Sequence, residues 1–299
     1  MDEPRRSPIL VTLDLLRVNQ WLKNVFVFGP LVFGRALLST EKFSAALLAF
    51  GLFSAVTSAA YIHNDISDIE TDRLHPRKRL RPIAAGTVSV PVARAAQIVL
   101  LVIGLGGAAL FEWSILRLLV AYVILNILYS GVLKRLVLLD VMAIAIGFVM
   151  RVQVGCRAVE IDPSVWILLC TFVLALFLGL GKRRHELIEA MAAGGEPQSN
   201  GRASYTTDFL AQTMGIASAV TIVCYAVFTV APETRAVHGT VSLIYTVPFV
   251  VYGLFRYQWL TYDPAGRGDP GDIVATDRPL QVTILVWIVT CVAIVYLKW

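Results

Sequence analysis

The chain has 299 residues, of which 57% are hydrophobic and only 16% charged, and its mean hydropathy is +0.70. Soluble domains carry about 25% charged residues, so this composition excludes a soluble globular protein and predicts an integral membrane protein. Its apolar stretches are about 20 residues long, the length that lets an α-helix cross a hydrocarbon core of ~30 Å, so we expect helices and not a barrel.

We predict an all-α bundle of nine transmembrane helices in a single membrane domain spanning residues 1–299. Residues 1–19 form a cytoplasmic or interfacial segment before the first span, and the polar start MDEPRRSP shows no cleavable signal peptide. The predicted spans are 20–38, 43–63, 91–111, 114–131, 136–156, 164–181, 209–231, 239–257 and 279–297.

Charge is distributed unevenly between the two sides of this topology. The N-terminal side holds 19 of the 26 basic residues and 16 of the 21 acidic ones. By the positive-inside rule this side faces the cytoplasm and the C-terminus lies outside a plasma membrane. A working surface for a polar, phosphate-bearing ligand is therefore expected on the cytoplasmic side.

Three cytoplasmic connections, 64–90, 182–208 and 258–278, are long enough to cap an active site. The first two have the same length and lie four spans apart, which hints at an internal duplication.

The segment NDISDIETD follows the second span. If the helix continues through it, Asp65, Asp68 and Asp72 lie at about 0°, 300° and 340° on the helical wheel, on one carboxylate face. With help from Asn64, these oxygen ligands are typical of a Mg²⁺ site that holds a diphosphate. Tyr61 lies a turn deeper on the same face, where its ring would form the floor for a ligand.

Basic residues supply the second part of the predicted site. Lys78, Arg79 and Arg81 follow the aspartates, and Lys182, Arg183 and Arg184 leave the sixth span in GLGKRRHE, which ends at Glu186. Such cations suit phosphate groups, although cations at a membrane exit are also common topogenic anchors.

Other candidate ligand-binding residues are Lys23 in QWLKN, Tyr129 and Lys134 in YSGVLKR, and Arg151 inside the fifth span. The two lysines are equally well explained as membrane anchors, whereas a guanidinium inside a span either extends to the outer face or points into a polar cavity. The four cysteines and four histidines are scattered, so we assign none of them to a metal.

The combination of NDISDIETD, RPIAAG, QWLKN and the tyrosine-and-lysine turn resembles the UbiA superfamily of intramembrane prenyltransferases across nearly the whole chain. This resemblance implies a nine-helix bundle around a lipid-accessible cavity, with Mg²⁺ and a diphosphate bound at the first aspartate motif.

The chain departs from the aromatic-prenylating members of that superfamily, which usually carry a second acidic motif after the sixth span. Here the sequence is GKRRHE. Together with KRLRPIAAG, SYTTDFL and GDIVATDRPLQ, it resembles the branch that transfers phosphoribosyl from phosphoribosyl pyrophosphate to decaprenyl phosphate, a step toward the arabinose donor of cell-wall arabinogalactan. That resemblance implies phosphoribosyl pyrophosphate, a polyprenyl phosphate and the bilayer as partners, and no nucleic acid.

Two alternatives remain open from the sequence. One is prenyl transfer from a polyprenyl diphosphate to an aromatic or other small acceptor, which uses the same fold and metal. The other is a transporter, which would place its charges near the midplane of the membrane rather than at its rim. Lipid length, oligomeric state and the number of bound Mg²⁺ ions are not fixed by the sequence.

Overall fold

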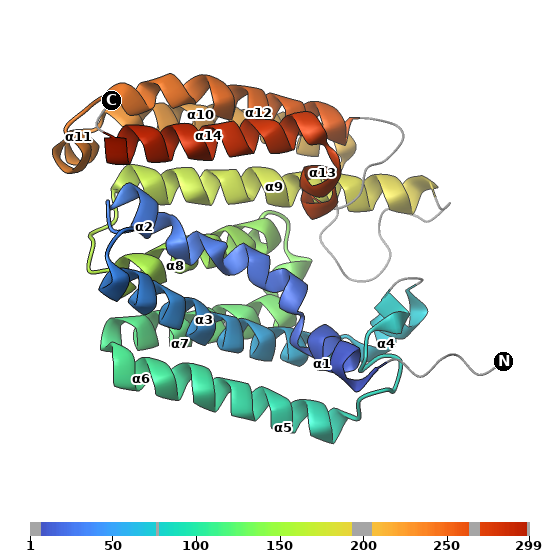
Figure 1. The fold of residues 1–299 in the computed structure, drawn as a ribbon. Helices are drawn as coiled ribbons and strands as arrows, with labels where there is room; N and C mark the ends of the chain where they lie inside the picture. The colour runs from blue at the N-terminus through green and yellow to red at the C-terminus, as the bar shows by residue number, and fades with distance from the viewer. Residues whose placement is uncertain (1–6, 76–77, 193–204, 263–269, 298–299) are drawn as a thin grey trace. The chain divides into compact units, whose positions relative to one another are not determined.

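The structure, a computed structural model, describes residues 7–75, 78–192, 205–262 and 270–297. In these ranges all regular secondary structure is helical (Figure 1). The chain divides into two compact units, which are described separately below.

The first unit consists of Met1–Gly29, Thr40–Val132 and Met150–Glu160. Its long helix α3 packs against α5 and against the 3₁₀ helix η1, around a core that includes Phe53, Val56 and Leu119. The elements of this unit are α1 (Pro8–Leu16), η1 (Val18–Phe28), α3 (Thr40–Ser67), α4 (Ile69–Leu74), η2 (Lys78–Leu80), α5 (Val90–Leu101), the π-helical turn η3 (Val102–Gly106), α6 (Gly107–Phe111), α7 (Trp113–Gly131) and the second half of α8 (Leu139–Ala158).

The second unit consists of Pro30–Ser39, Leu133–Val149 and Ile161–Trp299. Helices α9 and α10 form its main packed pair, around a core that includes Phe177, Leu210 and Met214. Besides most of α2 (Gly29–Phe33) and the first half of α8, its elements are η4 (Leu133–Arg135), α9 (Val165–Ala192), α10 (Thr207–Val230), α11 (Pro232–His238), η5 (Ser242–Thr246), α12 (Val247–Thr261), α13 (Pro270–Thr276) and α14 (Arg278–Leu297).

Several helices begin where a side chain accepts a hydrogen bond from a free N–H group of the first turn, or where a proline, which has no N–H, takes one of the first positions. Glu112 precedes α7 and accepts a hydrogen bond from the Ser114 N–H at 3.1 Å, which lowers the pKa of the Glu112 carboxyl group. Thr206 caps α10 in the same way, accepting from the Phe209 N–H at 3.2 Å. Proline opens α5 within its first two positions.

Seven helices in the described residues are long and apolar enough to cross a membrane, and an eighth is obtained if a bent pair counts as one span. The seven match predicted spans to within a few residues, apart from the C-terminal end of α9, which runs further than predicted. The bent pair joins Pro232–His238 to Ser242–Thr261 at 102° and replaces the span predicted at 239–257. The protein is thus a multi-pass helical membrane protein, but the count of nine spans is not confirmed.

The difference lies in the first predicted span, residues 20–38. No single α-helix covers it, because the chain forms the 3₁₀ helix η1 to Phe28 and then the five-residue helix α2. The stretch contains polar residues that a lipid-facing helix would not bury alone. Asn24 is fully buried, and its side-chain N–H donates to Ser54 Oγ at 3.0 Å. Hydropathy reports the apolar residues of this stretch but not the hydrogen-bond partners that its polar residues find inside the protein.

The predicted cytoplasmic loops contain more helix than expected. Helix α3 runs to Ser67 and α9 runs to Ala192, so both continue past their apolar stretches. The segment LIEAMA at the end of α9 consists of good helix formers, which explains this extension. Residues 193–204 and 263–269 of the other two predicted loops lie outside the described residues.

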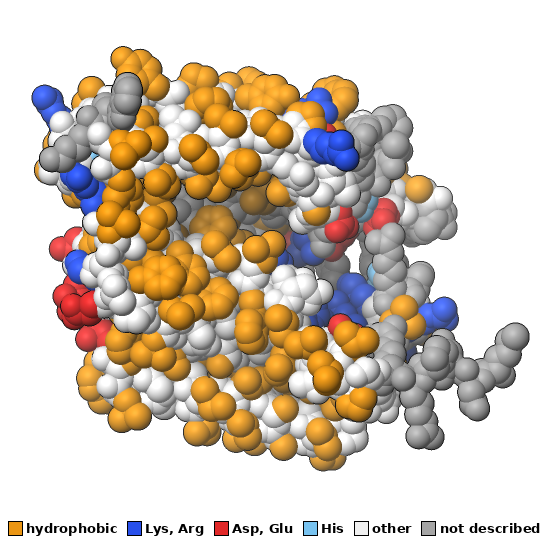
Figure 2. All heavy atoms as spheres, viewed as in Figure 1, with side chains coloured by type: hydrophobic (Ala, Val, Ile, Leu, Met, Phe, Trp, Pro, Cys, Tyr) orange, Lys and Arg blue, Asp and Glu red, His pale blue; other side chains and the backbone are white. Residues whose placement is uncertain are grey.

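Hydrophobic side chains cover most of the surface in view, and Lys, Arg, Asp and Glu gather toward the helix ends (Figure 2). Large apolar side chains such as Leu110, Val223 and Leu285 are more than half exposed. This distribution matches helices whose solvent is lipid along their length and water at their ends.

Gly155 in α8 provides a test of close packing in the first unit. A Cβ atom added at Gly155 would collide with the carbonyl group of Val27 in η1, whereas one added at Gly51, in the middle of α3, would meet nothing within 4 Å. We expect Gly155→Ala to lower the stability by about 1–3 kcal/mol because the backbone of η1 must move. Gly51→Ala should be neutral or slightly stabilising, since alanine is the better helix former.

The two variants would be compared by thermal unfolding in the same detergent. Equal melting temperatures would show that η1 and α8 do not pack as closely as described.

Candidate active site

Asp65, near the end of α3, is the most strongly held carboxylate of the first unit. Its side chain is 4% exposed. Arg17 binds it through two nitrogens: Nε donates to Oδ2 at 3.1 Å, and Nη2 makes a shorter bond to Oδ1. Arg17 ends α1 in a left-handed conformation, and its guanidinium also lies 5.2 Å from the centre of the Tyr61 ring. Tyr61, Arg17 and Asp65 therefore form one contact group.

Arg81 joins a second aspartate to this group. Its Nη1 atom donates to Asp65 Oδ1 at 3.2 Å and makes a shorter bond to Asp72 Oδ2. Asp72 lies in α4 and is 3% exposed. Two buried carboxylates are thus neutralised by two guanidinium groups, and we call Arg17, Asp65, Asp72 and Arg81 the aspartate–arginine cluster.

The expected continuous face of three aspartates is interrupted at Asp68. Helix α3 ends at Ser67 and α4 begins at Ile69, with Asp68 at φ −103° and ψ 10° between them. Backbone bonds four residues apart persist across the break, from Asp68 N to Asn64 O and from Asp72 N to Asp68 O. Asp65 and Asp72 converge as expected, but within the described ranges no three acidic, histidine or cysteine side chains form a group able to hold a metal.

The cluster nevertheless fits a hard divalent cation. One nitrogen, Arg81 Nη1, lies within hydrogen-bonding distance of oxygens from both Asp65 and Asp72. A guanidinium here occupies the position of a cation between two carboxylates. Carboxylate oxygens are the ligands that Mg²⁺ prefers, so the donor set matches the ion inferred from the sequence.

Asn64 and Tyr129 lie where α3 meets the end of α7. Asn64 Oδ1 accepts a hydrogen bond from Ser130 Oγ at 3.1 Å, so the amide is already oriented by α7. Tyr129 precedes Ser130 in the last turn of α7. The asparagine is thereby fixed beside the cluster.

Arg151 is buried inside the first unit and does not extend to the outer face, with only 4% of its surface exposed. Its Nε donates to Asn24 Oδ1 at 2.8 Å and its Nη2 to the Tyr122 hydroxyl at 3.2 Å. The guanidinium also lies 5.0 Å from the centre of the Phe53 ring and 5.3 Å from that of Tyr122. Amide, phenol and ring faces together solvate this charge.

Of the three predicted cations in the loop after the aspartates, Arg81 contacts both Asp65 and Asp72. Arg79 is exposed, and Lys78 lies half-buried in η2 with its backbone N–H bonded to His75 Nδ1 at 3.3 Å. Lys23 is exposed on η1. A contact with the aspartates is thus described for Arg81, whereas phosphate-binding roles for Lys23, Lys78 and Arg79 stay predictions.

The second unit has a separate polar network around Asp140, at the start of α8. Arg183 of α9 donates from Nε to Asp140 Oδ2 at 2.6 Å, and the Tyr205 hydroxyl donates to Asp140 Oδ1 at 2.5 Å. Arg183 Nη1 also binds Glu186 at 2.5 Å. Burial, reinforced by the bond to Asp140, raises the pKa of Tyr205, so its hydroxyl stays a proton donor.

The three consecutive cations of α9 thus have different surroundings. Arg183 is held by two carboxylates, and Arg184 binds the Thr261 carbonyl while lying 4.0 Å from the centre of the Tyr262 ring. Arg184 Nε is buried without a hydrogen-bond partner among the described residues. Lys182 and, in η4, Lys134 are half-buried. Arg183 and Glu186 are therefore paired within this network, and their part in substrate binding stays a prediction.

Sequence reasoning missed Arg17, Asp140, Tyr205, Asn24 and Ser130 as members of these networks. For Asp140 there was a usable signal, since an acidic residue at the start of an apolar helix needs a partner. For Arg17 there was none, because the contact joins residues 48 positions apart.

The fold and the aspartate–arginine cluster define a class of multi-pass helical membrane protein in which carboxylates and guanidiniums are buried and paired beside a spanning helix. The comparisons with known proteins narrow this class. Residues 27–270 match the UbiA prenyltransferase family, so the chain belongs to that family and is a transferase.

Two relatives that align with almost the whole chain carry the same name. The chain is 32% identical over 292 residues to "Decaprenyl-phosphate phosphoribosyltransferase" of Mycobacterium tuberculosis, covering 96% of this chain and 95% of the relative. It is 31% identical over 305 residues to the protein of the same name from Corynebacterium glutamicum, covering 99% and 91%. A UbiA homologue from Archaeoglobus fulgidus, solved bound to DMAPP and Mg²⁺, has a TM-score of 0.69 at 19% identity, covers 95% of this chain and 98% of that one, and shows the shared fold.

Replacing Arg81 tests whether its guanidinium occupies a cation position. Without divalent ions, Arg81→Gln should unfold at a lower temperature than the wild type, because two buried carboxylates lose a shared cation, at a cost of about 1–3 kcal/mol. Added Mg²⁺ should raise the melting temperature of this variant more than that of the wild type, since the ion no longer competes with a guanidinium.

Arg79→Gln is the matched control, because Arg79 is exposed in the same segment. If Arg81→Gln and Arg79→Gln respond equally to Mg²⁺, the cation position is not the one that Arg81 occupies.

Replacing Asp140 tests the network of the second unit. Asp140→Asn keeps an acceptor for Tyr205 but removes the charge opposite Arg183, and it should cost on the order of 3 kcal/mol. Asp208→Asn, on the exposed first turn of α10, should change stability by less than about 0.5 kcal/mol. Thermal unfolding in detergent measures both, and equally small shifts would contradict a structural role for Asp140.

Proposed function

We propose that the protein transfers the 5-phosphoribosyl group of phosphoribosyl pyrophosphate to a polyprenyl phosphate, releasing pyrophosphate. The observation that carries this proposal is the aspartate–arginine cluster of a UbiA-family transferase, in a chain about 32% identical over almost its whole length to decaprenyl-phosphate phosphoribosyltransferases. Decaprenyl phosphate is the acceptor that the names of those relatives indicate.

In this proposal Asp65, Asp72 and, from the break between the helices, Asp68 hold Mg²⁺, with Asn64 assisting. The bound ion would neutralise the pyrophosphate as it leaves. Arg17 and Arg81, which neutralise the aspartates in this structure, would donate to diphosphate oxygens if the carboxylates held the metal ion. Both guanidiniums keep a partner in either state, so the free and loaded enzymes both avoid an uncompensated buried charge.

The reaction requires few other groups from the protein. An oxygen of the acceptor phosphate forms a bond to ribose C1 as the bond from C1 to the diphosphate breaks. The acceptor is already an anion, so no side chain has to remove a proton from it. Positioning and charge stabilisation are then the main contributions of the protein, and these are what guanidinium and ammonium groups provide.

Other residues receive supporting roles. Tyr61 and Tyr129 would line the donor site, and Arg151 would hold Tyr122 and Asn24 in place beneath it. Lys23, Lys78 and Arg79 of the first unit, and Lys134, Lys182 and Arg184 of the second, are the proposed cations for the 5-phosphate and the lipid phosphate. Arg183 and Glu186, which are paired with each other on α9, are proposed to complete this substrate-binding set.

The proposed setting is the plasma membrane, with the N-terminus and active-site segments cytoplasmic and the C-terminus external, as the excess of basic residues indicates. The lipid-linked phosphoribose would serve as a precursor of the arabinose donor for cell-wall arabinan.

A second candidate function is prenyl transfer from a polyprenyl diphosphate to an aromatic or other small acceptor. The observation in its favour is the fold shared with UbiA homologues solved with DMAPP or GPP and Mg²⁺. The basic segment Lys182–Arg184 on α9 favours the first candidate, because a reaction with more phosphate groups needs more cations and fewer carboxylates.

An assay with purified, lipid-reconstituted protein distinguishes the two. With Mg²⁺, radiolabelled phosphoribosyl pyrophosphate and polyprenyl phosphate, we expect a lipid-linked phosphoribose. Asp65→Asn and Asp72→Asn should each lower the rate at least about a hundredfold, because each removes a carboxylate that would hold the Mg²⁺ needed to neutralise the leaving pyrophosphate. Asp208→Asn serves as the control and should keep full activity.

No product from phosphoribosyl pyrophosphate, together with turnover of a polyprenyl diphosphate and an aromatic acid, would replace the proposal with the second candidate.

A further inference from the structure

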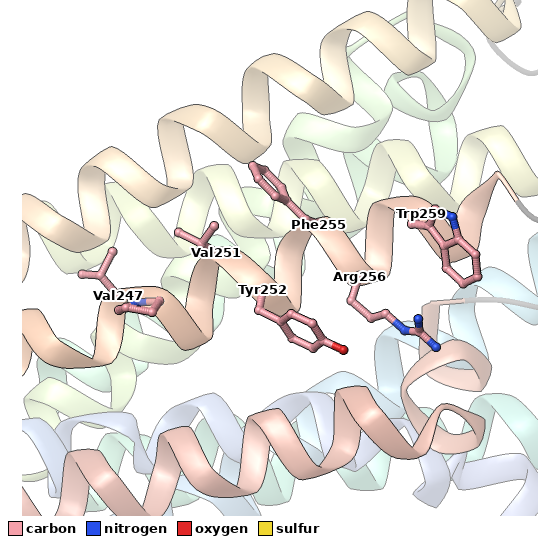
Figure 3. A pocket seen from close by; sticks show the side chains of 7 residues that line it. Val247, Val251, Tyr252, Phe255, Arg256 and Trp259 are labelled. Carbon is pink, nitrogen blue, oxygen red and sulfur yellow. The ribbon is translucent and has the colours of Figure 1, made fainter.

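The outer face of α12 in the second unit forms a groove of about 640 Å³ that the proposed reaction does not use. Figure 3 shows six of the side chains that line it. Tyr252, Phe255 and Trp259 are 48%, 57% and 59% exposed, so the groove is open along its length. The labelled side chains are Val247, Val251, Tyr252, Phe255, Arg256 and Trp259.

The groove is apolar at one end and rich in hydrogen-bond donors at the other. Val247 and Val251 line the apolar end, and Tyr252 and Arg256 extend to the same side of α12 toward the other end (Figure 3). The 12-residue separation of Val247 and Trp259 corresponds to ~18 Å of helix, slightly more than half of a hydrocarbon core of ~30 Å. A groove of this length matches the depth of one membrane leaflet, and it therefore suits a lipid with its acyl chain.

Arg256 is fixed by Asp277, the residue that precedes α14. Its Nη2 donates to Asp277 Oδ2 at 2.9 Å and its Nε to Asp277 Oδ1 at 3.3 Å. Asp277 Oδ1 also accepts from the Leu280 N–H at 2.9 Å and thereby caps α14. The carboxylate orients the guanidinium, and among the described residues Arg256 Nη1 has no hydrogen-bond partner.

Two more donors lie at the same end. Neither Trp259 Nε1 nor the Tyr252 hydroxyl makes a hydrogen bond to another described residue, and Arg278, at the first position of α14, is exposed. Phosphodiester oxygens accept hydrogen bonds and carry negative charge, which suits such a set of donors and cations. The face of Trp259 already holds the Arg256 guanidinium at 4.8 Å, so a second cation such as choline would be repelled there.

We propose that this groove is a binding site for an anionic membrane phospholipid, with an acyl chain along Val247 and Val251 and the phosphate at Arg256. The lipid headgroup would contact Arg256 near the end of α12. Asp277 bonds both to Arg256 and to the first turn of α14, so the bound lipid would join the end of α12 to the start of α14. This site is independent of the proposed reaction and stands whether or not the protein transfers phosphoribose.

The test measures which lipids the full-length protein retains. The protein is reconstituted in vesicles of phosphatidylcholine and phosphatidylglycerol, extracted in mild detergent and analysed by native mass spectrometry. We expect the wild type to keep phosphatidylglycerol selectively. Arg256→Gln should lower that retention about tenfold, the loss expected for one charge-assisted hydrogen-bonded contact.

Two further variants separate lipid binding from the fold. Tyr252→Phe and Trp259→Phe each remove one donor, leave the Arg256–Asp277 pair intact and should lower retention by several-fold. Arg94→Gln, on the exposed side of α5, removes a cation away from the groove and should leave retention unchanged.

Equal retention of the two phospholipids, or equal losses in Arg256→Gln and Arg94→Gln, would overturn the proposal. Displacement of phosphatidylglycerol by polyprenyl phosphate, but not by added phosphatidylcholine, would assign the groove to the lipid substrate instead and would equally overturn it.

Discussion

The first unit depends on one constraint: two carboxylates buried at the end of an apolar helix must be neutralised. Asp65 and Asp72 are almost inaccessible, and ionised carboxylates in such a place are strongly unfavourable unless paired. Arg17 and Arg81 provide the pairing. They also tie α1 and the segment after η2 to α3, so one electrostatic requirement organises three segments of the chain.

The second unit meets the same requirement differently. Asp140 is buried at the start of α8 and receives Arg183 from α9 and Tyr205 from the segment before α10. A carboxylate in the first unit shares guanidiniums that a metal could replace, whereas Asp140 is saturated by a guanidinium and a phenol. The two networks thus differ in their partners, although both are built from acids and arginines at helix ends.

The sequence predicted the helical class, the positions of seven spans and the region of the candidate site. These properties depend on local composition, since hydropathy over about 20 residues reports on lipid contact. The pattern failed at residues 20–38, where the 3₁₀ helix η1 gives way to the short helix α2 at Gly29, and it did not predict the bend between Pro232–His238 and Ser242–Thr261. The helical wheel failed at Asp68, because it assumes continuous α geometry and the chain breaks there.

From the sequence alone came the membrane class, the family resemblance and the prediction of a site at Asp65, Asp68 and Asp72 with neighbouring cations. Only the tertiary structure decided which cation meets which acid: Arg17 reaches Asp65 across 48 residues, and Arg183 reaches Asp140 across 43. It also showed that Asn24 and Tyr122 solvate Arg151, and that Asp277 fixes Arg256. The physical reason is that charge pairing depends on distances of a few ångströms between helices, and these distances are set by packing, which no local sequence pattern encodes.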